Sequence, residues 1–183
     1  MEVTVEISNR HIHLSREDYN KLFDAPMNNV KDLSQRGEFA SDKTVEVEGL
    51  GKIRVLGPLR PKSQLEISKT ESRKIKKQIH LRLSGHLDNA MSLEISTDKG
   101  TVEVPTIIAK RHLHCSQGDA EVNELRDGEI VSVKVDGERG ITFHEVVVRV
   151  KPSFTTVLHI DTDEGNAAGI NEDSKCTIIK NEL

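Results

Sequence analysis

The sequence predicts a mainly β protein, built of two small β-barrels that are related by internal duplication and capped by short α-helices. Over most of the 183 residues, short segments alternate apolar with polar residues, and valine is common, which favours strands. Turn-forming residues separate these segments, as they do in hairpins. One unusual motif occurs once in each half. The predicted division therefore falls near residue 90, between residues 1–90 and 91–183, and leaves room for strands exchanged between the barrels.

The repeated motif reads Arg-His-apolar-His-x-Ser and occupies residues 10–15 and 111–116. Side chains alternate between the two faces of a strand, so the two histidines of each copy point the same way. The serine of each copy, Ser15 or Ser116, is followed three residues later by an aspartate, which is typical of a helix N-terminus. Each copy therefore predicts a strand, a turn and a short helix.

The other strands follow from alternation and from the turn residues between them. Residues 3–7 alternate and lead into the first motif, whereas residues 106–109 form a strand that leads into the second. Turns at residues 49–51, 97–100 and 136–140 mark three hairpins. The remaining strands are predicted at residues 44–48, 52–56, 64–68, 93–95, 102–104, 130–135, 141–150, 156–160 and 176–179, and a loop or short turn at residues 30–37.

The two halves align beyond the histidine motif. Residues 65–70 correspond to residues 158–163, which places Glu66 and His159 at equivalent positions. Each half thus offers two histidines on one strand face and a third ligand-type residue from a later strand. The two predicted metal-binding sets are His11, His13 and Glu66 in the first half, and His112, His114 and His159 in the second half.

The donor types predict the metal. Imidazole and carboxylate ligands suit Zn²⁺, and three protein ligands with one open position are typical of a catalytic zinc site. We therefore expect two zinc ions per chain. The histidines that belong to neither predicted set are interpreted as surface residues: His80, His86 and His144.

Arg60 is the predicted anion-binding residue. It follows the rigid break at Gly57-Pro58 and precedes Glu66, so it is placed to hold an anion beside the first metal set. The planar guanidinium matches the oxygens of phosphate with a fork of donors.

The composition excludes several classes of protein. A formal net charge of −4 gives no overall attraction to nucleic acid or to an anionic membrane. No apolar run approaches the ~18 residues of a transmembrane helix, and the first strand resembles neither a signal peptide nor a transit peptide. Cys115 and Cys176 are too few for a disulfide framework, which favours a reducing cytoplasm.

These motifs resemble the phosphotransacylases of the PduL type, the phosphate propanoyltransferase family. The resemblance covers almost the whole chain and rests on motifs in the same order at residues 8–15, 31–35, 54–60, 64–68, 111–114 and 159–169. It implies two β-barrels capped by short helices, two zinc ions and a homodimer. It also implies the reversible conversion of a short-chain acyl-CoA (propanoyl- or acetyl-CoA) and phosphate into acyl phosphate and free CoA.

The resemblance also implies roles for particular residues. The first metal set would hold a zinc ion whose shell the CoA sulfur completes, and the second set a zinc ion that also carries water or phosphate. Arg60 would bind the attacking phosphate. The implied CoA contacts are Ser8, Lys31, Arg54, Leu56 and Asn166.

Three features depart from the family pattern. Cys115 stands where methionine is expected after the second histidine pair, and its thiolate would lie near a zinc ion. Arg73 stands where an apolar or aromatic residue often meets the adenine. The chain opens directly on its first strand, without the N-terminal amphipathic extension of members packaged in bacterial microcompartments, so packaging by that route is not expected.

The expected mechanism is direct attack of phosphate on the thioester carbon, because no Ser-His-Asp or Cys-His arrangement is evident. Cys115 as a nucleophile is the competing mechanism, although no separate base accompanies it. Two other functions stay open: a bicupin-like metal-binding barrel and a non-catalytic zinc-binding module. An amidohydrolase-type barrel also uses His-x-His but needs about 250 residues.

Overall fold

The computed structural model describes residues 1–171 and 173–180, which form two compact units. Unit 1 consists of Met1–Ser8, Ser34–Arg36 and the chain from Lys110 onward, and unit 2 consists of Asn9–Leu33 and Gly37–Ala109. Each unit thus draws residues both from 1–90 and from 91–183. The predicted mainly β class with short capping helices is confirmed.

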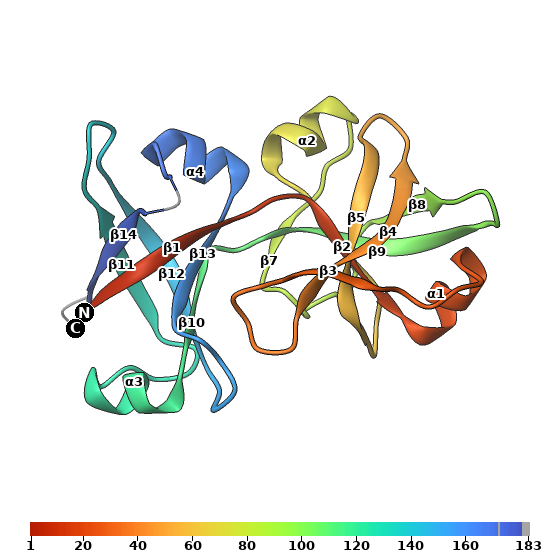
Figure 1. The fold of residues 1–183 in the computed structure, drawn as a ribbon. Helices are drawn as coiled ribbons and strands as arrows, with labels where there is room; N and C mark the ends of the chain where they lie inside the picture. The colour runs from red at the N-terminus through yellow and green to blue at the C-terminus, as the bar shows by residue number, and fades with distance from the viewer. Residues whose placement is uncertain (172, 181–183) are drawn as a thin grey trace. The chain divides into compact units, whose positions relative to one another are not determined.

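Unit 1 is a closed barrel with short helices at its ends. Its strands, in order around the barrel, are β1 (Glu2–Ser8), β13 (Val157–Asp161), β10 (His112–Cys115), β12 (Ile141–Val150), β11 (Ile130–Val135) and β14 (Lys175–Ile179). Helix α3 (Gln117–Val122) and helix α4 (Thr162–Ala168) lie at opposite ends of this barrel in Figure 1. The second histidine pair lies on β10, between β12 and β13.

Unit 2 is a larger sheet that also returns on itself. Its strands follow the order β3 (Asn29–Asp32), β4 (Phe39–Val47), β5 (Gly51–Arg60), β2 (His11–Ser15), β6 (Gln64–Glu66), β9 (Thr101–Ala109) and β7 (Leu81–Arg82). Strand β8 (Ser92–Ser96) pairs with β9 along its length and with β4 at one position, which closes the path. Helices α1 (Arg16–Leu22) and α2 (Lys69–Lys74) complete the unit.

The two closed paths correspond strand for strand. Unit 2 runs β5-β2-β6-β9-β8-β4, and unit 1 runs β12-β10-β13-β1-β14-β11, with the histidine pair second in each. Strand β1 therefore corresponds to β9, and each of these strands immediately precedes a histidine strand that belongs to the other unit. Figure 1 shows this exchange by colour, since red β1 lies among blue strands and green β9 among orange ones.

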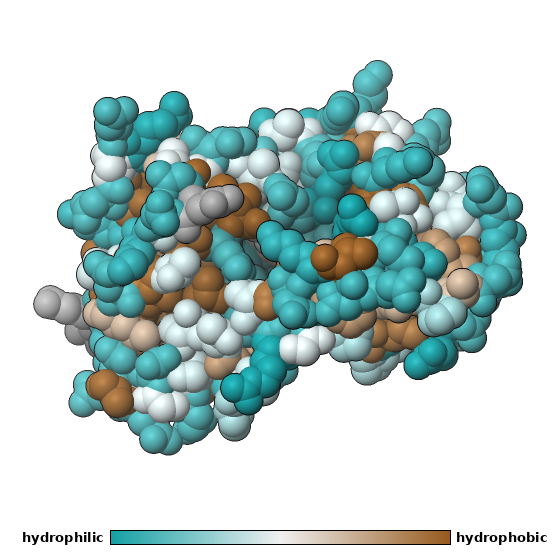
Figure 2. Space-filling view, viewed as in Figure 1, coloured by the Kyte–Doolittle hydropathy of each residue, from teal (hydrophilic) through white to brown (hydrophobic). Residues whose placement is uncertain are grey.

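Each unit has its own core of aliphatic side chains. The clusters are rich in Val, Ile and Leu, and Tyr19 and Phe143 are their only buried aromatic residues within the part of the chain that the structure describes. A core of this kind is expected for a chain with 3% aromatic residues. Figure 2 shows hydrophilic residues over most of the visible face, with apolar residues in small groups between them. Among the described helices, none is both long and apolar enough to cross a membrane.

Both predicted helix starts are confirmed. Ser15 caps α1 and Ser116 caps α3, each accepting a hydrogen bond from the backbone N–H of the aspartate three residues later. The loop or short turn predicted at residues 30–37 is partly wrong, because residues 29–32 form β3 against β4. All four residues of β3 are exposed, so the strand has no alternation of apolar and polar residues that sequence inspection could detect.

Candidate functional site

The first predicted metal set is brought together by strand pairing. Strands β2 and β6 are antiparallel, with His11 opposite Glu66, and His13 lies two residues further on the same face of β2. The ligand-type atoms of the three side chains lie within 4.8 Å of one another. Nδ1 of His11 lies 2.8 Å from the carbonyl oxygen of Asn9. Since a carbonyl only accepts, Nδ1 carries the proton, and Nε2 is left as the ligating atom.

The burial of His13 and its unsatisfied ring nitrogen fit a metal-binding role. The residue is 2% exposed, and its Nδ1 has no hydrogen-bond partner among the described residues. Burial lowers the pKa of His13 well below its usual value, and the neighbouring His11 and Arg60 lower it further. A neutral imidazole with an unsatisfied buried nitrogen is costly unless a ligand meets it, and a cation is the partner that neutral imidazole accepts.

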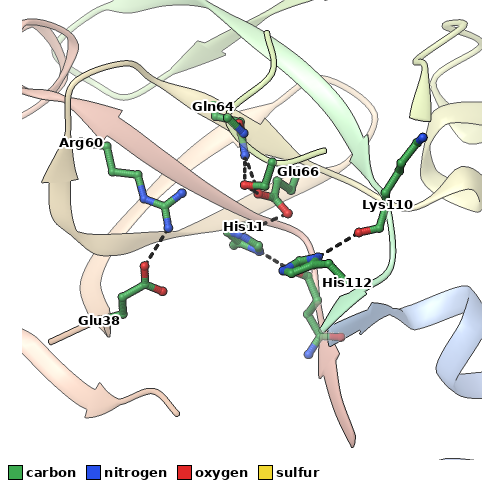
Figure 3. Close-up of polar contacts among 10 residues, drawn as sticks. His11, Glu38, Arg60, Gln64, Glu66, Lys110 and His112 are labelled. Atoms are coloured by element: carbon green, nitrogen blue, oxygen red, sulfur yellow. Dashed lines mark hydrogen bonds and ion pairs between the residues drawn. The ribbon is translucent and has the colours of Figure 1, made fainter. Parts of the chain in front are cut away.

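Polar neighbours hold Glu66 in place (Figure 3). The carboxylate oxygen Oε1 accepts hydrogen bonds from Gln64 Nε2 at 2.5 Å and from Ser84 Oγ at 2.9 Å. The backbone N–H of Gly85 donates to Gln64 Oε1 at 2.8 Å and so fixes the amide. The other oxygen, Oε2, lies 3.8 Å from Nε2 of His11. The protein thus holds Oε1, and Oε2 lies on the side of His11, an arrangement that orients the carboxylate within the ligand set.

The second predicted set has the same construction in unit 1. His112 lies opposite His159 across β10 and β13, and the ligand-type atoms of His112, His114 and His159 lie within 4.8 Å of one another. Nδ1 of His112 lies 2.9 Å from the carbonyl oxygen of Lys110, which again leaves Nε2 as the ligating atom. The ring of His114 stacks on Phe154 with centroids 4.3 Å apart.

An arginine braces each histidine strand against a helix. Arg10 pairs with Glu71 at 2.7 Å, and Arg111 pairs with Glu164 at 2.7 Å. Each glutamate is the third residue of a helix, α2 or α4, in a capping box that follows the strand of the third ligand. The arginine of the repeated motif thus ties its histidine pair to the element that carries the third ligand.

A second brace lies at the other end of each histidine strand. The backbone N–H of Ser15 donates to Ser63 Oγ at 2.8 Å, and Ser63 Oγ donates to Asp18 at 2.5 Å. The same arrangement in unit 1 joins Ser116, Thr156 and Asp119. Because Ser63 immediately precedes β6, this brace helps to hold the register that sets His11 opposite Glu66.

Arg60 forms an ion pair with Glu38, with Nη2 2.8 Å from Oε1 (Figure 3). The ring of Phe39 packs directly over Gly57, which has no side chain to prevent this approach, and Glu38 is thereby held beside the end of β5. The charge of Arg60 lowers the pKa of His13, so the guanidinium lies near the first metal set. An anion that binds Arg60 has to compete with Glu38.

The implied CoA contacts are divided between the units. Arg54 and Leu56 lie on β5 beside the first histidine pair, in register with His11 and His13, and Arg54 donates to the carbonyl oxygen of Ser41 at 2.7 Å. Lys31 is exposed on β3. In unit 1, Ser8 lies at the end of β1 and Asn166 is exposed on α4. Their role in binding CoA stays a prediction.

Other residues singled out in the sequence belong to neither set. His80, His86 and His144 are exposed, as predicted, and Arg73 is exposed in the last turn of α2. Cys115 is fully buried in the apolar core of unit 1, and burial raises the pKa of its thiol. A protonated core thiol is poorly suited to be a nucleophile or an additional zinc ligand.

Sequence inspection missed several polar neighbours of the site: Glu6, Ser34, Glu38, Gln64 and Ser84. Gln64 had a detectable signal, because it lies two residues before Glu66 and so on the same strand face. Glu38 and Ser84 reach the site from segments with no local pattern.

Comparison with known proteins agrees with the sequence motifs. The family model described as phosphate propanoyltransferase matches residues 4–171. The phosphate propanoyltransferase of Clostridioides difficile is 42% identical over 97% of this chain and 89% of its own length. That of Salmonella typhimurium is 41% identical over 91% of this chain and 83% of its own length. That of Listeria monocytogenes is 37% identical over 97% of this chain and 87% of its own length.

We expect the native protein to show no fast-reacting thiol at pH 8. Burial raises the pKa of Cys115, and raises that of Cys176 to about 12, so the reactive thiolate is scarce at any pH below these values. A chromogenic disulfide reagent should therefore titrate both thiols only after the protein is unfolded in denaturant. One rapidly modified thiol in the native protein would contradict this burial.

Proposed function

The chain belongs to the phosphate propanoyltransferase family, and from this premise we propose that it converts a short-chain acyl-CoA and phosphate reversibly into acyl phosphate and CoA. Propanoyl-CoA and acetyl-CoA are the proposed substrates. The observation that carries the proposal is the convergence of His11, His13 and Glu66 beside Arg60. We further propose that the protein forms a homodimer and lies in the cytoplasm. A reducing compartment agrees with its two free, buried cysteines.

The two ligand sets are proposed to bind one zinc ion each. The support comes from the neutral, unsatisfied nitrogen of His13 and from the backbone carbonyls that fix the tautomers of His11 and His112. When bound, zinc supplies a Lewis acid for the thioester carbonyl and a soft partner for the departing thiolate. The chain's own part is to hold the ligands, and Gln64 and Ser84 do this for Glu66.

Arg60 is proposed to bind and orient the attacking phosphate. Its guanidinium presents several N–H donors, of which the structure shows one directed to Glu38. A phosphate that carries more negative charge than one carboxylate competes for these donors and receives two parallel hydrogen bonds. Holding phosphate next to the thioester makes a bimolecular encounter effectively unimolecular.

The proposed transfer is a direct displacement. A phosphate oxygen forms a bond to the carbonyl carbon of the thioester, the carbon–sulfur bond breaks, and the thiolate of CoA leaves with the electron pair. Cys115, the competing nucleophile, is fully buried in the core of unit 1. The proposed CoA contacts remain Ser8, Lys31, Arg54, Leu56 and Asn166.

CoA release tests the proposed function. Purified protein should release CoA from propanoyl- and acetyl-CoA only when phosphate is present, and chelation should abolish this activity. Single-turnover mass spectrometry should find no acylated side chain. Release without phosphate would indicate a thioesterase, and an acylated residue would reject direct attack. No release by a protein that still binds two zinc ions would favour the non-catalytic module or the bicupin-like barrel.

Replacing Arg60 tests its role in binding phosphate. Arg60→Ala should lower kcat/KM for phosphate by at least about 100-fold, because loss of a charge-assisted bidentate contact in the transition state costs several kcal/mol. Zinc content should stay at the parent value. Arg126→Ala, at an exposed arginine outside both sets, is the matched control. Parent-level turnover by Arg60→Ala would remove Arg60 from the mechanism.

Replacing Gln64 tests how Glu66 is held. Gln64→Met keeps the volume of the buried side chain but removes the donor to Glu66, so zinc affinity of the first set should fall about 10- to 100-fold. The measurement is competition with a chromophoric chelator in a His112→Ala background, in which only the first set is intact. Gln117→Met on the exposed face of α3 should have no effect. Equal affinity in the two variants would show that Gln64 does not support the ligand.

A further inference from the structure

The ion pair between Arg60 and Glu38 places a carboxylate at the proposed anion site. Nη2 of Arg60 lies 2.8 Å from Oε1 of Glu38, and both side chains are half-buried. An ion pair that water reaches contributes little to stability. A carboxylate also repels any anion that approaches the guanidinium. The position of Glu38 therefore calls for an explanation other than stability or general attraction of anions.

The backbone on both sides of this ion pair is fixed within unit 2. The carbonyl oxygen of Glu38 accepts a hydrogen bond from the N–H of Leu33 at 3.0 Å. The next residue, Phe39, pairs with Gly57 between β4 and β5, and its ring fills the space that a side chain at Gly57 would need. Arg60 is the last residue of β5. Strand pairing therefore holds the carboxylate beside the guanidinium.

Arg60 keeps donors for an anion while it holds Glu38. A guanidinium carries several N–H donors, and within the described residues the structure shows one hydrogen bond from this guanidinium, to Glu38. Figure 3 shows the other terminal nitrogen of the guanidinium pointing away from Glu38. An anion that accepts hydrogen bonds from the remaining donors therefore lies next to the carboxylate of Glu38 and meets its negative charge.

Phosphate and sulfate differ in what they present to such a carboxylate. At pH 8 phosphate is chiefly the dianion HPO₄²⁻, which keeps a proton on one oxygen, whereas sulfate is SO₄²⁻ and keeps none. An ionised carboxylate only accepts hydrogen bonds, so it can receive the P–O–H proton in a strong, charge-assisted bond. Sulfate has the same charge and shape, but its oxygens bring only lone pairs to the carboxylate. A carboxylate beside the guanidinium therefore selects the anion that carries a proton.

We propose that Glu38 is a specificity-determining residue that accepts a hydrogen bond from the P–O–H group of phosphate while Arg60 donates to two other phosphate oxygens. This inference rests on the phosphate-binding role of Arg60 in the proposed function. The remaining oxygen is left to attack the thioester. Sulfate is disfavoured because its oxygen and the carboxylate of Glu38 are both acceptors, and such an unfavourable contact with the wrong ligand is a general means of specificity.

Calorimetric titration with phosphate and with sulfate, at pH 8 in the presence of CoA, tests the inference. The parent should bind sulfate at least about 10-fold more weakly than phosphate, because a site that pairs with an O–H group rejects an analogue without it. In Glu38→Gln the ratio of the two dissociation constants should fall at least about 10-fold, because the amide can turn an N–H donor to sulfate. Glu46→Gln removes the same charge from an exposed position of β4 and should keep the parent ratio. An unchanged ratio in Glu38→Gln would overturn the proposal.

A second variant separates acceptance of the proton from simple charge repulsion, and circular dichroism checks that each variant is folded. HPO₄²⁻ and SO₄²⁻ carry the same charge, so removing a purely repulsive carboxylate would strengthen the binding of both anions equally. Glu38→Met removes the acceptor as well and should bring the two dissociation constants close together. Arsenate keeps a proton as phosphate does, so it should follow phosphate in every variant. A parent-like ratio in Glu38→Met, or arsenate that binds the parent as weakly as sulfate, would reject the proposal.

Phosphate-dependent CoA release by the parent, measured in parallel, keeps the two proposals distinguishable. No release combined with a Glu38-dependent ratio would reject the acyltransferase and support the role of Glu38. Release combined with the parent ratio in Glu38→Gln would reject the role of Glu38 alone. A parent that binds phosphate no more tightly than sulfate would reject that role whether or not it releases CoA.

Discussion

The antiparallel register between each histidine strand and its neighbour is the constraint on which both ligand sets depend. The pairing of His11 with Glu66, and of His112 with His159, exists only if β2 and β6, and β10 and β13, meet at one register. A slip of one residue would turn every side chain of the strand to the other face and disperse both sets. The hydroxyl–aspartate brace and the arginine–glutamate pair act at the two ends of each strand, so they oppose such a slip from both directions.

Burial of apolar side chains helps to select this register. The residue between the two histidines is Ile12 in one motif and Leu113 in the other, and both are fully buried. Each contributes about 1.5–3 kcal/mol by leaving water. Because side chains alternate along a strand, burying Ile12 or Leu113 in the core directs the flanking histidines to the opposite face. The ligand face is thus determined by the hydrophobic face, and the buried polar atoms of the ligand face are retained at some cost in stability.

The sequence was sufficient to predict features that are local or duplicated. Alternation and turn residues predicted most strands, and the repeat predicted that Glu66 and His159 would stand at equivalent places. Glu6, Ser34 and Glu38 could not be predicted, because their position depends on which strands and loops meet in three dimensions. Strand β3 was missed for a different reason, since a strand exposed on both faces has no hydrophobic pattern.

The exchange of β1 and β9 bears on how such a chain arises. A half-length protein of the same pattern would carry one strand that its own ring does not use, and two copies would complete each other, which is domain swapping, a low-cost route to a homodimer. Gene duplication and fusion would then keep both rings in one polypeptide while allowing each copy to mutate alone. Such divergence would produce contrasts like those between Glu66 and His159, and between Ile107 and Glu6. One ancestral site would then become two sites that are free to specialise.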